Sequence, residues 1–224
     1  MPRRRDSHEF DDRYLRHHER RLHELGYRVV AGIDEAGRGA LAGPVVAAAV
    51  VLPPEVLILG VQDSKALTAE VRARLCREIW AAAEAVGVGI ADAAEIDAVN
   101  ILEATYRAMA RAVAALDPPA DFALVDGLPV KRLGVPHQGI VKGDQEVFLI
   151  AAASIVAKVT RDALMVELEA QYPGYGFAAH KGYGTRSHRE AIRRLGVCPI
   201  HRRSFGPVAE ALHPSLPALL DGRE

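Results

Sequence analysis

The stretch AGIDEAGRGALAGPVV, from Ala31 to Val46, decides how this sequence folds and where its chemistry lies. An apolar run leads into two adjacent carboxylates, Asp34 and Glu35, and a glycine-rich segment follows them. Charge beside a buried strand is unfavourable unless a partner offsets it. The stretch therefore predicts a buried strand that ends in a polar site. The glycine-rich segment beside it predicts a backbone that a ligand can approach closely.

The segments around this stretch predict a mixed α/β sheet. Two strands, Arg28–Asp34 and Pro44–Leu52, flank the glycines, so a hairpin is the expected connection. Further along the chain, apolar periodicity and turn residues predict a helix from Thr68 to Val86 that ends at Gly87, a strand Val88–Ala91, a helix Ala94–Leu116, strands Phe122–Val125 and Gln138–Val141, and a helix from Glu146 to Tyr172.

The bulk composition is that of a globular protein. The 224 residues are half apolar and one quarter charged, with a net charge of −1. We expect three parts, namely a polar lead-in (1–26), one catalytic domain (27–210) and a tail (211–224). Two distant cysteines, no long apolar run and no secretory signal favour a cytoplasmic protein that does not bind a membrane.

The charge is unevenly distributed along the chain. Residues 178–207 hold seven Lys or Arg against a single acid, Glu190, together with three histidines. Such a basic segment favours an anionic partner, and a solvated helix face is an equally good explanation on charge alone.

Acidic residues stand at the ends of three predicted strands. Asp34 and Glu35 end the first, Asp126 ends a later one, and Asp144 lies just past another. If these strands are neighbours, the four carboxylates converge at one edge of the sheet. Like charges raise one another's pKa, so protons or hard cations must offset them, and ligands that are all oxygen suit Mg²⁺ or Mn²⁺. Taken singly, Asp126 is as readily a turn residue and Asp144 a helix cap.

The glycines admit a second explanation, a dinucleotide-binding loop. Their spacing is G-x-G-x-x-x-G, and Pro44 and a strand follow instead of a helix N-terminus, which disfavours that explanation. Gly37 and Gly39 instead let a ligand approach the backbone closely because no Cβ atom intervenes.

Seven segments together resemble ribonuclease HII, the bacterial type 2 ribonuclease H. They are, in chain order, GIDEAGRGALAGPVVAAAV, DSKALT, DG, KGDQ, AAASIVAKVTRD, HKGYGT and RRSFGPV. The resemblance runs from about Val29 to Val208, and the set is specific although each segment alone is weak. It implies a ribonuclease H-like mixed five-stranded sheet flanked by helices, with a helical C-terminal extension.

The same resemblance implies a site and an activity. Asp34, Glu35, Asp126 and Asp144 match the family's four acids and would bind two divalent ions, Mg²⁺ or Mn²⁺. The substrate would be an RNA–DNA hybrid or DNA with embedded ribonucleotides, cut hydrolytically on the 5′ side of the ribonucleotide to leave 3′-hydroxyl and 5′-phosphate ends. The remaining matched positions would bind substrate: Gly37, Arg38 and Gly39 at the 2′-hydroxyl, Tyr183 at the following sugar, and Lys65, Ser154 and Lys158 near phosphates, with Arg161 a further candidate.

The implied chemistry is phosphodiester hydrolysis by two metal ions, without a Ser, Cys or His nucleophile. Three alternatives stay open from the residues: another metal nuclease of the same superfamily, a non-catalytic nucleic-acid-binding module that uses the basic segment, and the dinucleotide-binding enzyme. Because no apolar stripe requires a partner subunit, we expect a monomer.

Overall fold

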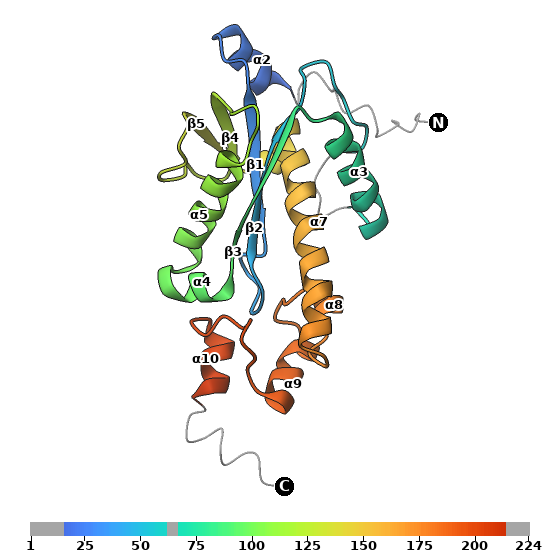
Figure 1. The fold of residues 1–224 in the computed structure, drawn as a ribbon, viewed down its shortest axis with the longest axis vertical. Coiled ribbons are helices and arrows are strands. Elements are labelled where there is room, and N and C mark those ends of the chain that lie inside the picture. Colours follow the sequence, from blue (N-terminus) through green and yellow to red (C-terminus); the bar gives the residue numbers. More distant parts are fainter. Residues whose placement is uncertain (1–15, 62–66, 214–224) are drawn as a thin grey trace, which may run out of the picture.

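The computed structural model describes residues 16–61 and 67–213, and the strands in these ranges form one mixed sheet of five strands in the order β3-β2-β1-β4-β5 (Figure 1). The strands are β1 (Val30–Ala36), β2 (Val45–Val51), β3 (Ala85–Ala91), β4 (Phe122–Asp126) and β5 (His137–Ile140). The helices are α2 (His17–Glu24), α3 (Ala69–Ala82), α4 (Ala93–Val99), α5 (Ile101–Ala114), α6 (Gly143–Glu146), α7 (Phe148–Gln171), α8 (Phe177–His180), α9 (Arg186–Leu195) and α10 (Gly206–Leu212).

The sheet combines an antiparallel and a parallel half. β1, β2 and β3 follow one another as an antiparallel meander, as the predicted hairpin requires. β4 and β5 run parallel to β1 on its other side. Because successive side chains of a strand point to opposite faces, this register fixes which residues of each strand share a face. The predicted fold class is confirmed.

Helices cover both faces of the sheet (Figure 1). α3 and α7 share one hydrophobic core with the sheet, and α5 packs on the opposite face over a second core. The three C-terminal helices α8, α9 and α10 lie beyond the turn of the β1–β2 hairpin (Figure 1). They form the helical extension that the resemblance implies.

Helices lie at both limits of the predicted catalytic domain. α2 falls within the predicted polar lead-in, yet Leu22 belongs to the core under α7. The buried carboxylate of Glu19 accepts a hydrogen bond from the Leu149 amide at 3.1 Å. At the other end, α10 continues to Leu212, two residues past the predicted limit. Within the described ranges, no helix combines the length and apolar character that crossing a membrane requires.

Two predicted helices were wrong in extent. The helix predicted to reach Val86 ends at Ala82, because Ala85–Ala91 pairs along its whole length with β2. Gly87 is therefore a strand residue, and a Cβ atom there would overlap the Ala112 carbonyl of α5. The helix predicted over 94–116 is two helices. They meet at Asn100, whose backbone has φ of 70° and whose side chain caps α5.

Candidate active site

Asp34 and Asp126 lie side by side on neighbouring strands. The parallel register pairs Ile33 with Val125, so the next residue of each strand, Asp34 and Asp126, is also level with its neighbour. β1 continues to Ala36, so Asp34 and Glu35 lie within the strand, and the prediction that the first strand ends there was wrong. The pairing of these residues with β2 extends the strand past its charges.

Burial dominates the electrostatics of Asp34. Its side chain is 6% exposed, and desolvation, followed by the charges of Glu35 and Asp126, raises its pKa well above the usual range. Two hydrogen bonds oppose this effect. The Ser154 hydroxyl of α7 donates one, and the Glu35 amide donates the other to Oδ1 at 2.7 Å. The carboxylate is therefore held in place, but its negative charge is poorly compensated by the protein.

Of the other two predicted acids, Glu35 follows Asp34 in β1, and Asp144 lies in α6, which contacts β4. Asp144 is buried in the short helix α6, and its neighbour Gly143 faces Asp126, since a Cβ atom on Gly143 would stand 3.5 Å from Asp126 Oδ1. Glu35 is half-buried and forms an ion pair with Arg38 at 3.2 Å. The four acids, separated by up to 110 positions in the sequence, thus lie on the neighbouring elements β1, β4 and α6.

The fit of this acid cluster to a metal can be judged from its donors. The four side chains supply only carboxylate oxygens, which suit hard divalent cations. Like-charge repulsion and burial at Asp34 are the conditions that a bound cation relieves. Within residues 16–61 and 67–213, however, no three Asp, Glu, His or Cys side chains stand close enough together to hold a metal ion. Binding therefore requires these carboxylates to move toward the ion.

The glycine turn beside the acid cluster has two different glycines. At Gly37 φ is +97°, and a Cβ atom would overlap the side chain of Arg161, so packing within the protein requires glycine there. At Gly39 a Cβ atom would meet nothing within 4 Å, and the residue is exposed. Of the two, only Gly39 leaves open space at the surface where a ligand could approach.

Tyr183 lies against the same turn. It forms an isolated β-bridge with Ala40, which brings the HKGYGT segment beside the β1–β2 hairpin. Its ring faces two cations of α7, with Arg161 Cζ at 5.3 Å and Lys158 Nζ at 5.8 Å from the ring centroid. Lys158 also pairs with Asp162 at 2.6 Å. The predicted substrate contact Lys65 lies outside the described residues.

The sequence prediction missed a buried histidine cluster below Tyr183. His201 Nε2 and His188 Nε2 are 3.1 Å apart, and His188 Nδ1 lies 3.0 Å from the Tyr183 carbonyl oxygen. The Cys198 amide donates to His201 Nδ1 at 3.0 Å. These contacts define one chain of neutral rings, in which His201 donates to His188 and His188 donates to Tyr183. Burial lowers the pKa of His201 to about 4, which keeps that ring uncharged.

Only a weak signal could have indicated this cluster. Both histidines stand in a segment whose many cations favour a surface helix, and nothing in their spacing marks them as buried. The amphipathic pattern of α9, which places His188 with Ala191 and Ile192 on its buried side, is the one feature that separates His188 from the surrounding arginines.

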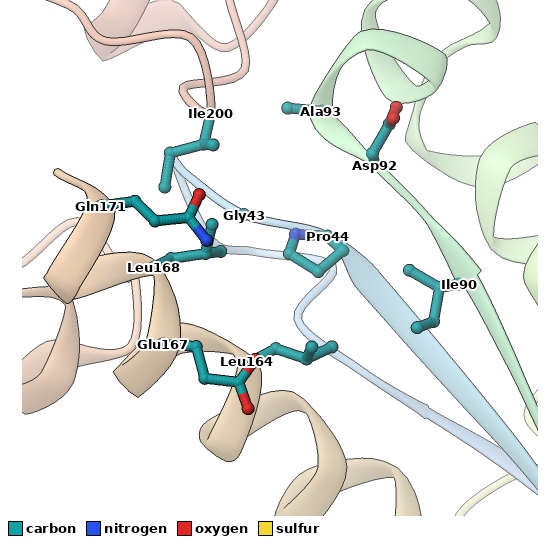
Figure 2. A pocket seen from close by; sticks show the side chains of 10 residues that line it. All are labelled: Gly43, Pro44, Ile90, Asp92, Ala93, Leu164, Glu167, Leu168, Gln171 and Ile200. Carbon is teal, nitrogen blue, oxygen red and sulfur yellow. The ribbon is translucent and has the colours of Figure 1, made fainter.

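A pocket of about 270 Å³ lies apart from the acid cluster (Figure 2). It opens between the end of β3 and the C-terminal half of α7, and its lining is mainly apolar, with Ile90 and Leu164 on opposite sides. The carboxylates of Asp92 and Glu167 stand at its edges. No predicted site residue lines it, so the acid cluster is the candidate active site.

Comparison with known proteins gives consistent matches. The family model described as Ribonuclease HII matches residues 31–208. A ribonuclease HII of Geobacillus kaustophilus is 57% identical over 90% of this chain and 77% of its own, and one of Geobacter metallireducens is 57% identical over 84% and 89%. The crystal structure of ribonuclease H2 from Pyrococcus horikoshii superposes with a TM-score of 0.70 at 27% identity, covering 82% of this chain and 97% of that one.

Proposed function

The chain belongs to the ribonuclease HII family and is an endoribonuclease that acts on RNA–DNA hybrids, and from this premise we propose that it also cuts duplex DNA at embedded ribonucleotides. We propose that Asp34, Glu35, Asp126 and Asp144 hold two divalent ions, Mg²⁺ or Mn²⁺. The proposed products are a 3′-hydroxyl and a 5′-phosphate end, and the proposed form is a monomer.

The observation that carries the catalytic proposal is the position of Asp34. A carboxylate that is 6% exposed and stands next to Asp126 raises the free energy of the folded state unless a proton or cation offsets its charge. A merely structural residue at this point of β1 would be apolar, like Ile33 and the residues of β2 around it. Binding of a hard cation would explain why the Asp34 carboxylate is buried at this position.

The protein residues have separate tasks in this proposal. The four carboxylates would hold the ions, which would supply activation of the attacking water and stabilisation of charge on the departing oxygen. Ser154 and the Glu35 amide orient the Asp34 carboxylate through their hydrogen bonds. The ion pair with Arg38 orients Glu35 at the mouth of the site. These contacts restrict the orientations of Asp34 and Glu35, which limits the adjustment that binding the ions requires.

Recognition of the ribonucleotide is assigned to the glycine turn and Tyr183. The 2′-hydroxyl is the group that distinguishes RNA from DNA at one position. Gly39 is exposed and has open space around it, so its backbone can approach a sugar closely. Tyr183 stands beside the same turn and would pack on the next sugar. Lys158 and Lys65 would bind phosphates, which holds the register without reading sequence.

The test compares two duplexes that differ in a single hydroxyl. One carries a single ribonucleotide, and the other is DNA throughout. With Mg²⁺ or Mn²⁺ we expect cleavage of the first only, 5′ to the ribonucleotide, with ends that a ligase and a phosphatase identify as 3′-hydroxyl and 5′-phosphate. Cleavage in excess EDTA, or equal cleavage of both duplexes, would contradict the proposal.

A further inference from the structure

Two arginines lie completely buried behind the glycine turn. Arg161 comes from α7, and Arg202 follows the bridge between Ala42 and His201, and neither has any exposed surface. A buried guanidinium is ordinarily paired with a carboxylate, because an isolated charge there is strongly unfavourable. Within residues 16–61 and 67–213, neither arginine forms an ion pair.

Both guanidinium groups instead bind backbone carbonyls of one short segment, residues 38–44, which we call the recognition turn. Arg161 donates from Nε to Pro44 at 2.9 Å and from Nη2 to Ala42 at 3.3 Å. Arg202 donates from Nε to Gly43 at 3.0 Å and from Nη1 to Arg38 at 2.8 Å. Four of the seven carbonyls of the turn are therefore directed inward by two side chains that lie 41 positions apart.

The backbone amides of the turn fall into two groups, those that bond within the protein and those that do not. Those of Leu41 and Ala42 bond to the Gly182 carbonyl, and that of Gly43 bonds to Ile200. Among the described residues, the amides of Arg38 and Gly39 find no acceptor. With the carbonyls held from behind, these amides are the backbone donors that remain for a ligand.

Arg161 also connects the turn to Tyr183. Its guanidinium lies over the Tyr183 ring at 5.3 Å, and its side chain fills the space that a Cβ atom on Gly37 would occupy. One group therefore touches both elements to which ribonucleotide recognition is assigned. Complete burial argues against a direct phosphate contact, since a phosphate could reach this guanidinium only if the turn moved away.

The arrangement is a poor stabilising device. In the described part of the chain, Arg161 Nη1 and Arg202 Nη2 are buried without a hydrogen-bond partner. A buried donor left unsatisfied costs free energy, and two like charges near one another add to the cost. The presence of two buried arginines is therefore better explained by their effect on the geometry of the turn than by a contribution to stability.

We propose that Arg161 and Arg202 are positioning residues that fix the recognition turn, so that its free amides meet the 2′-hydroxyl and Tyr183 meets the next sugar. The inference rests on the proposed function, since it names what holds that same site. Lysine keeps the charge but cannot donate two diverging hydrogen bonds from a planar group. Arg161→Lys and Arg202→Lys are therefore the informative variants. Arg111→Lys is the matched control, because Arg111 also donates to a backbone carbonyl, that of Ile90 at 2.6 Å, which is not part of the turn.

The first readout is kinetic, on a duplex with one ribonucleotide. We expect both lysine variants to lower kcat about 10- to 100-fold, since a small misplacement has effects of this size, and to change KM less than about threefold. Arg111→Lys should match the wild type. A phosphate contact would give another pattern: kcat would be kept, and the slope of log affinity against log salt would fall by about 0.9. That pattern, or unchanged kinetics in both folded variants, would overturn the proposal.

The second readout does not depend on activity. Hydrogen exchange of the bonded amides of Leu41, Ala42 and Gly43 should rise at least about tenfold in either variant, because the side-chain hydrogen bonds that hold the turn in place are lost. Should the wild type fail to cleave, the proposed function falls, and exchange alone decides the positioning role. Unchanged exchange in both variants would refute that role. If Arg161→Lys does not fold, Arg202→Lys applies the same test to the other side of the turn.

Discussion

The acid cluster and the histidine cluster are both buried groups of titratable side chains, but they are satisfied in different ways. Every bond in the chain from Cys198 through His201 and His188 to Tyr183 joins two protein groups, and the rings stay neutral. At Asp34 the neighbours Glu35 and Asp126 add to the negative charge. The difference indicates that a cluster whose bonds are complete within the protein serves structure, whereas a buried carboxylate placed beside other carboxylates suits a bound cation.

The largest expected effect follows from removing charge at Asp34. Asp34→Asn should lower cleavage of a ribonucleotide-containing duplex by at least about 10³-fold, because a carboxylate ligand is lost and some 4 kcal/mol of transition-state stabilisation goes with it. The thermal midpoint should stay equal or rise, since repulsion in the acid cluster falls. Rate and midpoint are measured on the same preparation.

Asp92→Asn is the matched control for this variant. Asp92 also follows a strand, but it accepts the Glu95 amide at 2.8 Å as the cap of α4, a task that Asn performs equally well. Its activity should equal that of the wild type. Cleavage at the wild-type rate by Asp34→Asn would show that the acid cluster is not catalytic.

A substitution in the histidine cluster should lower the stability of the fold. His201→Ala opens a cavity and leaves His188 and the Cys198 amide without their partner, so the free energy of unfolding should fall by about 2–4 kcal/mol. Urea denaturation measures it, with the exposed His213→Ala as control. A loss below about 0.5 kcal/mol would mean that the histidine chain does not support the fold.

The pH dependence of stability tests whether His201 is neutral. Its folded pKa is about 4, below the usual 6.5, so the unfolded state takes up the proton first and stability falls as pH drops from 6.5 to 4. The stability advantage of the wild type over His201→Ala should shrink by about 3 kcal/mol between pH 7 and pH 4. A constant difference across that range would mean that the pKa of His201 is the same in the folded and unfolded states.

Exposed charges should have the smallest effect on the fold. Arg186 and Glu190 of α9 form an ion pair at 2.7 Å, but the arginine side chain is 92% exposed. Arg186→Gln should change the free energy of unfolding by less than about 0.5 kcal/mol in urea denaturation. If Arg186→Gln lowered the free energy of unfolding as much as His201→Ala does, the buried histidines would not be more important for stability than the exposed charges of the basic segment.

The sequence predicted the elements that depend on local patterns. Continuous apolar runs and the turn residues around them gave the hairpin of β1 and β2 and the strands around Leu124 and Gly139, and the long apolar periodicity gave α7. It failed where tertiary contacts override local preference. Val86 and Gly87 continue the apolar pattern of the preceding helix, but they belong to β3 because all seven residues of β3 pair with β2. Asn100, with its positive φ, divides a continuous apolar periodicity into two helices.

The residues of the candidate site also fall into those that local sequence patterns predict and those that depend on tertiary contacts. Acids at strand ends predicted that Asp34, Asp126 and Asp144 meet, since strand topology alone brings them together. The buried placement of Arg202 and His201 could not be predicted, because it depends on how residues 197–205 fold back on the hairpin. Gly37 had suggested room for a ligand, and the structure instead places Arg161 there.

Direct binding of Mn²⁺, followed by electron paramagnetic resonance, tests the contrast between the two clusters most directly. The wild type and His201→Ala should each bind the ion, since the histidine chain is complete without it, and Asp34→Asn should lose most of that binding. Binding kept by Asp34→Asn, or abolished by His201→Ala at a temperature where that variant is folded, would contradict the account.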